Sequence, residues 1–319
     1  MKNFQLRLNR IFPFAIAITI LGLSSCKDVT EILPEPGPQN VLWKMGGEGD
    51  LKFNTLLTGI SRAGLENVLS EAGPFTVFAP TNESFQKFFS TNNLSPDKLF
   101  ANPNLADILT YHVVSGNVTS DDVMTGPVTS LSGDVFYVSV DPEGDIWING
   151  NTVISDVDKM ASNGVIHTLD YVITPPTMSI AEIAVENTTA STPEFTQLVA
   201  ALTRAGLVDA VSGGTTDNLT VFAPTDAAFE DLYTSLGVSG VDEIDVDLLT
   251  DVLLYHVVPS RAFSQDLRDG ASLPTLLEGN NLSVDLPGLM INESELVPSM
   301  LNIHATNGVI HVIDKVLVP

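Results

Sequence analysis

The chain has 319 residues, a usual length for two globular domains. Its 39 acidic residues against 14 basic ones give a formal charge of -25. This excess argues against a nucleic-acid-binding protein, which needs a basic surface to displace counterions from phosphate. Cys26 is the only cysteine, so neither an intrachain disulfide nor a cysteine-based zinc site can form.

The chain begins with a targeting segment. Basic residues near the start precede a mainly apolar run over 11–23, which is too short to span a bilayer comfortably. This pattern predicts a signal peptide over residues 1–25. The small residues before Cys26, in Leu23-Ser24-Ser25, resemble the lipobox of bacterial lipoproteins. The resemblance implies that Cys26 is lipidated and becomes the first residue of the mature chain. An ordinary secretory signal with an incidental cysteine is the alternative.

Residues 26–38 are expected to form a tether. Proline and glutamate alternate in Pro34-Glu35-Pro36, and such a composition favours a stiff, solvated segment. Lys27-Asp28, directly after the cysteine, loosely resembles the signal by which some outer-membrane lipoproteins reach the cell surface. We therefore expect a lipid-anchored protein of the outer membrane or cell surface.

Three blocks of identical sequence recur 144 residues apart. Thr-Val-Phe-Ala-Pro-Thr stands at 76–81 and 220–225, and Tyr-His-Val-Val stands at 111–114 and 255–258. Asn-Gly-Val-Ile-His stands at 163–167 and again at 307–311. This period is too long for one unit of a solenoid. It predicts a tandem duplication, with domains over 39–175 and 177–319 that each fold around a core of their own.

In the first copy, apolar residues between 50 and 70 mostly follow helical spacing and predict one or two amphipathic helices. Residues 75–78 are aromatic and β-branched, which predicts a strand that leads into a helix capped by Thr81 or Asn82. Further strands are expected over 134–141, 145–149 and 164–173. The last of these is largely apolar on both alternations, as is typical of a central strand.

Histidines accompany the repeated blocks. His112 and His256 lie on the apolar faces of their predicted helices, so we interpret them as core histidines that fix a helix end by hydrogen bonding. If Asn307-Gly308 forms a two-residue hairpin turn, His304 faces His311 directly. These two are weak candidates for a metal site, but no third ligand is identifiable. We expect no metal and no other cofactor.

The three blocks, in this order, resemble the fasciclin I domain family over nearly all of 39–319. The resemblance implies an α+β fold of two tandem domains, each a wedge-shaped, mainly antiparallel β-sandwich with packed helices. It also implies extracellular adhesion or matrix interaction without catalysis. In animal members the Tyr-His region is linked to integrin adhesion, which makes Tyr111, His112, Tyr255 and His256 the candidate partner contacts.

The leading hypothesis is a lipid-anchored adhesion or binding module that recognises an extracellular protein or polysaccharide and meets the membrane only through its lipid. The alternative is a glycan-capture accessory lipoprotein of a nutrient-uptake system. We expect no enzyme, because the sequence lacks a nucleophile elbow, a zinc-protease motif and a phosphate-binding loop. The acidic cluster over 242–251 lacks the spacing of an EF-hand, and we interpret it as a solvated helix start rather than a calcium site.

Overall fold

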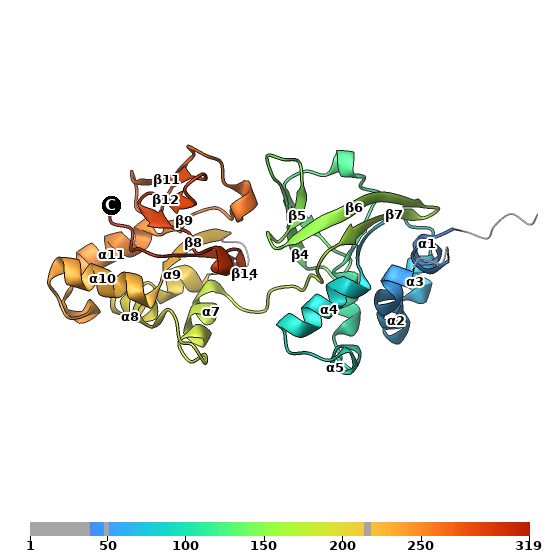
Figure 1. The fold of residues 1–319 in the computed structure, drawn as a ribbon, viewed down its shortest axis with the longest axis horizontal. Coiled ribbons are helices and arrows are strands. Elements are labelled where there is room, and N and C mark those ends of the chain that lie inside the picture. The colour runs from blue at the N-terminus through green and yellow to red at the C-terminus, as the bar shows by residue number, and fades with distance from the viewer. Residues whose placement is uncertain (1–38, 48–50, 214–217) are drawn as a thin grey trace, which may run out of the picture. The chain divides into compact units, whose positions relative to one another are not determined.

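The structure, a computed structural model, describes residues 39–47, 51–213 and 218–319. The predicted signal peptide, Cys26 and the tether lie outside the described residues. Within the described ranges, no helix has both the length and the apolar character needed to cross a membrane. A similar order of helices and strands occurs twice along the chain (Figure 1).

The first domain has a helical part and a strand-rich part, whose elements alternate along the chain. Its helical elements are α1 (Val41–Gly46), η1 (Leu51–Phe53), α2 (Asn54–Arg62), α3 (Glu66–Ser70), α4 (Asn82–Thr91), α5 (Pro96–Phe100), α6 (Leu105–Thr110) and η2 (Ser120–Asp122). Its strands are β1 (Phe75–Pro80), β2 (Val113–Ser115), β3 (Gly126–Thr129), β4 (Val135–Val140), β5 (Ile146–Ile148), β6 (Thr152–Ala161) and β7 (Gly164–Leu169).

The second domain follows the same plan. Its helical elements are α7 (Ile180–Asn187), α8 (Thr196–Arg204), α9 (Val208–Ser212), α10 (Asp226–Leu236), η3 (Val241–Glu243), α11 (Val246–Tyr255), η4 (Ser264–Asp266) and η5 (Pro298–Met300). Its strands are β8 (Leu219–Pro224), β9 (Val257–Val258), β10 (Ser272–Pro274), β11 (Asn281–Asp285), β12 (Met290–Ile291), β13 (Ser294–Glu295), β14 (Ile303–Ala305) and β15 (Gly308–Ile313).

The strands of the first domain follow the order β2-β1-β7-β6-β5-β4-β3. Only the β1–β7 pair among these described strands is parallel. In the second domain, β14-β15-β8-β9 and β10-β11-β12-β13 form two sheets, and β8 and β15 are again parallel. The expected α+β class with mainly antiparallel strands is confirmed.

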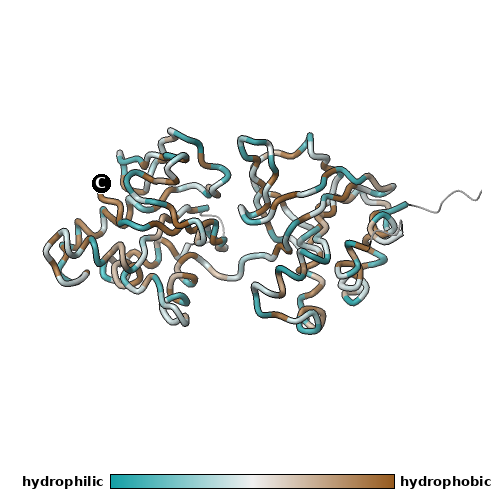
Figure 2. The backbone as a smooth tube through the Cα atoms, viewed as in Figure 1, coloured by the Kyte–Doolittle hydropathy of each residue, from teal (hydrophilic) through white to brown (hydrophobic). Residues whose placement is uncertain are grey.

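Each domain has two layers of core. One layer, with Met45, Phe53 and Ile166 in the first domain, lies between the helices and one face of the sheet. The other, with Phe136 and Ile148, lies between the two halves of the strand-rich part. Figure 2 shows hydrophobic residues along the strands of both domains. Burial of apolar side chains on both faces explains why the central strands read as apolar on both alternations.

Several local predictions are confirmed. Thr81 is the N-cap of α4, where its hydroxyl accepts a hydrogen bond from the amide of Ser84 at 3.1 Å. The strand that follows Asn163 is central, because β7 lies between β1 and β6 and is buried throughout. β6 itself was not predicted. Its register shifts around Asp156 and Lys159, and Asp158 has a left-handed φ of 60°, so the alternation of side chains is interrupted.

The predicted hairpin register is wrong by one residue. Ala305 pairs with Gly308 and His304 with Val309, so the two-residue turn is Thr306-Asn307 and His304 does not face His311. The first copy has the same geometry, with Met160 opposite Val165. The residue types of Asn-Gly favour the two central positions of a turn, but in this fold the asparagine and the glycine have separate structural roles.

The asparagine joins distant helices to the turn. The Asn307 side chain accepts a hydrogen bond from the amide of Ile180 at 2.9 Å and donates one to the carbonyl of Val211 at 2.9 Å. Asn163 makes the equivalent bonds to Val41 and Leu69. A single buried amide therefore satisfies one unpaired group at the start of one helix and one near the end of another.

The glycine lets two backbones approach closely. A Cβ atom on Gly164 would lie 2.0 Å from the carbonyl oxygen of Phe75 in β1, and one on Gly308 would lie 2.2 Å from that of Leu219 in β8. No side chain fits at these distances. The parallel pairing of the first and last strands of each domain therefore requires glycine at this position.

We predict that Gly164→Ala destabilises the first domain by more than about 3 kcal/mol, because β7 must move away from β1 to admit the methyl group. Urea unfolding followed by tryptophan fluorescence reports this domain, since Trp43 and Trp147 are the only tryptophans. Gly59→Ala is the matched control. A Cβ atom on Gly59, which lies in a helix, would be 3.4 Å from its nearest neighbours, a normal van der Waals contact. This variant should therefore be as stable as the wild type or more stable. Equal stability of the two variants would contradict the prediction.

Candidate functional site

Each histidine of the Tyr-His pairs joins a helix end to the last segment of its domain. The Nδ1 atom of His256 lies 2.7 Å from the carbonyl oxygen of Val252, and Nε2 accepts a hydrogen bond from the amide of Leu317 at 2.9 Å. His112 makes the equivalent contacts at 2.8 Å and 3.2 Å. These contacts fix the neutral form with the proton on Nδ1, and they confirm the interpretation as core histidines.

Both histidines resist protonation. Burial lowers the pKa of His112 and of His256 to about 4, because a charged imidazolium loses its hydration in the core. Protonation would also place a second N–H of His256 against the amide of Leu317. Neither side chain can exchange protons with a ligand at neutral pH.

The tyrosines fasten the same helix ends to the strand-rich part. The Tyr255 hydroxyl donates to the carbonyl of Asn281 at 3.1 Å and accepts from the side-chain amide of Asn292 at 2.8 Å. Tyr111 bonds in the same way to Val135 and Asn149. Burial raises the pKa of the Tyr111 hydroxyl well above its usual value, which keeps this group neutral.

These positions leave the candidate contact residues almost no surface for a partner. Tyr111 is 0% exposed, His112 1% and His256 3%, whereas Tyr255 keeps 7%. In this fold the four side chains join elements together. Of the four side chains, that of Tyr255 is the most exposed.

The histidines of the last block hold a different loop. His311 is stacked on Phe222 with the ring centroids 5.7 Å apart. Its Nε2 atom lies 2.9 Å from the carbonyl oxygen of Ala262, and Nδ1 accepts from the amide of Asn302 at 3.3 Å. The Thr220 hydroxyl holds the same loop through Ser260 and Ala262.

The weak metal candidates are not brought together. His304 lies opposite Val309, and both ring nitrogens of His311 are engaged with the backbone. In the part of the chain that the structure describes, no group of three histidine, cysteine, aspartate or glutamate side chains is placed to hold a metal ion. The acidic cluster begins a helix, since the Asp245 carboxylate caps α11 by accepting from the amides of Asp247 and Leu248.

A surface groove of about 610 Å³ lies beside Tyr255 in the second domain. We call it the Tyr255 groove. It is lined by Tyr255, Ser283, the β12–β13 turn at 292–293, Ser294 of β13 and the closing segment at 315–318. The lining is partly polar and partly apolar. Ser283 and Lys315 supply polar groups, and Val318, which is 57% exposed, supplies apolar surface.

The Tyr-His pair positions the walls of this groove. Tyr255 holds Asn292 in the turn, and His256 holds Leu317 in the closing segment. Ser294 completes the link, because its hydroxyl accepts from the amide of Lys315 at 2.9 Å. Sequence reasoning missed the groove, because its residues come from separate segments and only the tyrosine belongs to a repeated block.

We predict that acid weakens the first domain through His112. The unfolded histidine has a pKa near 6.5 and the folded one about 4, so unfolding takes up a proton between these values. The stability from this group is present above pH 6.5 and falls as the pH drops towards 4. Between pH 7 and 5 the loss should be about 2 kcal/mol.

Urea unfolding at pH 7 and pH 5, followed by tryptophan fluorescence, measures this loss. His112→Gln lowers the stability at pH 7 but should remove about 2 kcal/mol of the pH dependence. A His112→Gln profile as steep as that of the wild type would show that His112 is not the group that titrates.

The chain matches the profile of the Fasciclin domain family twice, over residues 51–175 and 193–319. Protein sll1483 of Synechocystis sp. is 45% identical over 132 residues, which are 40% of this chain and 70% of that protein. Transforming growth factor-beta-induced protein ig-h3 of Sus scrofa is 33% identical over 77% of this chain, and Periostin of Homo sapiens is 28% identical over 80%.

The chain spans 35% of the length of the ig-h3 protein and 29% of that of Periostin. A solved structure of a FAS1 domain pair from the insect cell adhesion molecule Fasciclin I is also similar. The superposed region covers 85% of this chain and 98% of the Fasciclin I chain, with 17% sequence identity and a TM-score of 0.37. The two profile matches take in most of the chain and contain all three repeated blocks twice. The chain therefore belongs to the Fasciclin domain family and carries two tandem copies of the domain.

Proposed function

We propose that the protein is a lipid-anchored module that binds a protein or glycan partner outside the cytoplasm and serves adhesion. The main support for this proposal is that the repeated Tyr-His pair has a structural role. Tyr255 and His256 use their hydrogen-bonding groups to position the walls of the Tyr255 groove, so these groups shape a surface and are not available for a reaction. A shaped surface without a reactive group is what a binding module needs.

Membership of the Fasciclin domain family supports the same assignment, because the resemblance to this family implies extracellular adhesion or matrix interaction without catalysis. Four histidines of this chain, His112, His167, His256 and His311, are buried and bonded to backbone atoms. A general acid or base must reach the proton that it transfers, so these four are poor candidates for catalysis.

The Tyr255 groove is the proposed contact surface. Its polar groups include the hydroxyl of Ser283 and the ammonium of Lys315, and Val316 and Val318 add apolar surface. This combination suits an extended chain with alternating polar and apolar groups. The strong negative charge of the whole molecule disfavours an anionic polymer as the partner.

A glycan-capture role is the second candidate, and one feature of the groove favours it. Hydroxyl, amide and ammonium groups line the groove at Ser283, Asn292 and Lys315. They donate to Asn292, Tyr255 and Glu293 within the protein, and their remaining donor and acceptor capacity suits sugar hydroxyls. Stacking on a sugar ring is the weaker part of this case, because only 7% of Tyr255 is exposed.

Lipid anchoring rests on Cys26. We predict that the protein expressed in a bacterium incorporates labelled fatty acid and sediments with the membrane fraction. Cys26→Ser should remove the label and release the protein, since the apolar leader alone does not span a bilayer. Label retained by Cys26→Ser, or a soluble wild-type protein, would overturn the anchor.

Binding through the groove is tested with Val318→Arg. Binding to immobilised matrix proteins and to cell-wall polysaccharides should fall at least about tenfold, because the arginine places bulk and a charge in the groove. Val185→Arg is the matched control, since Val185 is 51% exposed on α7 and does not line the groove. Capture of proteins alone supports adhesion, and capture of polysaccharides alone supports glycan capture. Equal binding by both variants would exclude the groove as the contact surface.

A further inference from the structure

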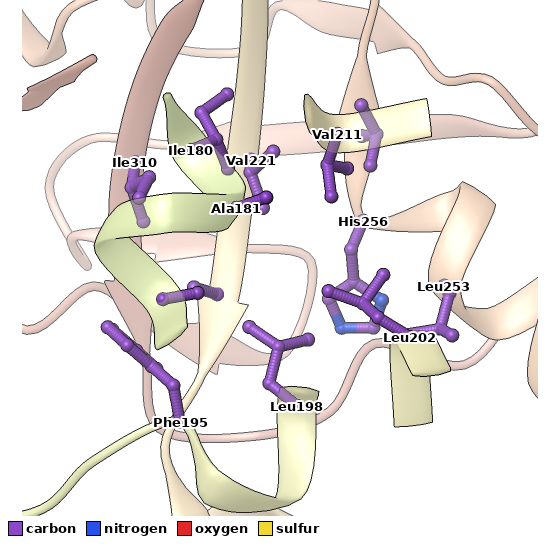
Figure 3. A pocket seen from close by; sticks show the side chains of 13 residues that line it. Ile180, Ala181, Phe195, Leu198, Leu202, Val211, Val221, Leu253, His256 and Ile310 are labelled. Atoms are coloured by element: carbon purple, nitrogen blue, oxygen red, sulfur yellow. The ribbon is translucent and has the colours of Figure 1, made fainter. Parts of the chain in front are cut away.

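The helical core of the second domain offers no room for a ligand. Leu202, Leu253 and His256 are among the side chains that surround a space of about 20 Å³ (Figure 3), which is room for about one water molecule. Any further binding surface of this domain must therefore lie outside the core. The loop that His311 holds through Ala262 is such a surface, and a turn of the first domain is bonded to it.

The turn between β5 and β6 of the first domain fits against this loop. The side-chain amides of Asn302 and Gln265 both donate to the carbonyl of Gly150, at 2.8 Å and 3.0 Å. In return, the side-chain amide of Asn151 donates to the carbonyl of Asn302 at 2.8 Å. We call the receiving surface, residues 261–265 together with Asn302, the docking site.

An aromatic cluster beside the turn joins the same two domains. The half-buried guanidinium of Arg261 lies over the ring of Tyr137 in β4, 4.3 Å from its centroid. The rings of Phe263 and His304 pack against Tyr137 with centroids 6.1 Å and 6.0 Å away. The Tyr137 hydroxyl donates to the side chain of Asn218 at 2.8 Å. Cation–π contacts are stronger where water is excluded, so this cluster adds to the hydrogen bonds at Gly150.

The last repeated block fixes the docking site in place. Arg261 donates to the carbonyls of Ala305 and Gly308, at 3.0 Å and 2.7 Å. The backbone amide of Asn302 donates to Nδ1 of His311 at 3.3 Å, and Asn302 is held at a left-handed φ of 54°. A site that is already ordered loses little entropy when another segment docks on it.

The turn can reach the docking site only because its tip is a glycine. Gly150 has a φ of 68°, and a Cβ atom there would lie 2.6 Å from Phe263 and 2.7 Å from Asn302. These distances leave no room even for a methyl group. Glycine at this position therefore serves both the turn conformation and the close approach of the two domains.

These contacts explain why residues 38–319 form one compact unit although they contain two domains. We propose that the docked turn holds the two domains in one fixed arrangement, so that the pair behaves as a single rigid body. Domains of one chain that lack a specific interface move relative to one another.

The first domain has a counterpart of the docking site that lacks the bonding groups. Asp158 corresponds to Asn302, because its amide donates to the equivalent histidine, His167, and its φ of 60° is also left-handed. A carboxylate has no N–H to donate to a carbonyl. The cation and the aromatic ring are missing as well, since Asn117 and Thr119 stand at those positions of the repeat.

The second domain in turn lacks the turn that docks. Its β12–β13 connection, 292–293, is one residue shorter than the β5–β6 connection, 149–151. Ser283 stands in the place of Tyr137, since the amide of each donates to the asparagine that opens its connection. The turn and the docking site thus occur once each. The contact joins the first domain to the second, and the reverse contact between two chains lacks both halves.

Distances between spin labels test the proposal. In the full chain with Cys26→Ser, labels on Gln86→Cys in α4 and Glu230→Cys in α10 report on the two domains, and both positions are exposed. An excess of unlabelled chain leaves only distances within one chain. Pulsed electron paramagnetic resonance should give one narrow distance distribution, because the docked turn fixes the two domains.

Gly150→Ala should widen this distribution at least about twofold, because the methyl group prevents docking and frees the domains. Gly144→Ala is the matched control. It places the same methyl group at a left-handed glycine, with φ of 92°, where no atom lies within 4 Å, so the distribution should stay narrow.

Asn302→Asp is the second variant, and the first domain shows that the fold accepts aspartate there, at Asp158. It removes the donor to Gly150 and should also widen the distribution. Widening in either variant, with a folded circular dichroism spectrum and a narrow Gly144→Ala control, supports the proposal. A broad distribution in the parent chain would overturn it. So would widening in the control, or narrow distributions in both folded variants.

Discussion

The close parallel pairing of the first and last strands closes each domain, and the rest of the fold depends on it. Gly164 and Gly308 permit the approach, since any side chain there would collide with the neighbouring carbonyl. The asparagine just before each glycine then ties the same corner to two helices. Strand pairing and helix packing are thus fixed at one point, as expected where a buried amide satisfies otherwise unpaired backbone groups.

The other repeated residues extend from this corner towards the surface. Tyr255 and His256 hold a turn and the closing segment, and together these form the walls of the Tyr255 groove. Repetition of the Tyr-His pair in both copies reflects a requirement of the fold, whereas partner recognition is what we propose for the side chains that line the groove.

Much of the fold could be predicted from local patterns. The capped helix after β1 follows from Thr81 beside a β-branched run, and the central position of β7 follows from its apolar alternations. Two errors have physical causes. Asn-Gly also suits a two-residue turn, so the pattern predicts a register that places His304 opposite His311, whereas His304 pairs with Val309 in the structure. β6 was missed because the left-handed Asp158 interrupts its alternation.

The duplication and the burial of the repeated histidines follow from the sequence alone, because they rest on identity at one period and on polarity along neighbouring residues. The groups that those residues bond and the place of the groove depend on the tertiary fold. The amide of Ile180 meets Asn307 across 127 positions. Contacts of that separation arise from the packing of whole elements, which no local pattern encodes.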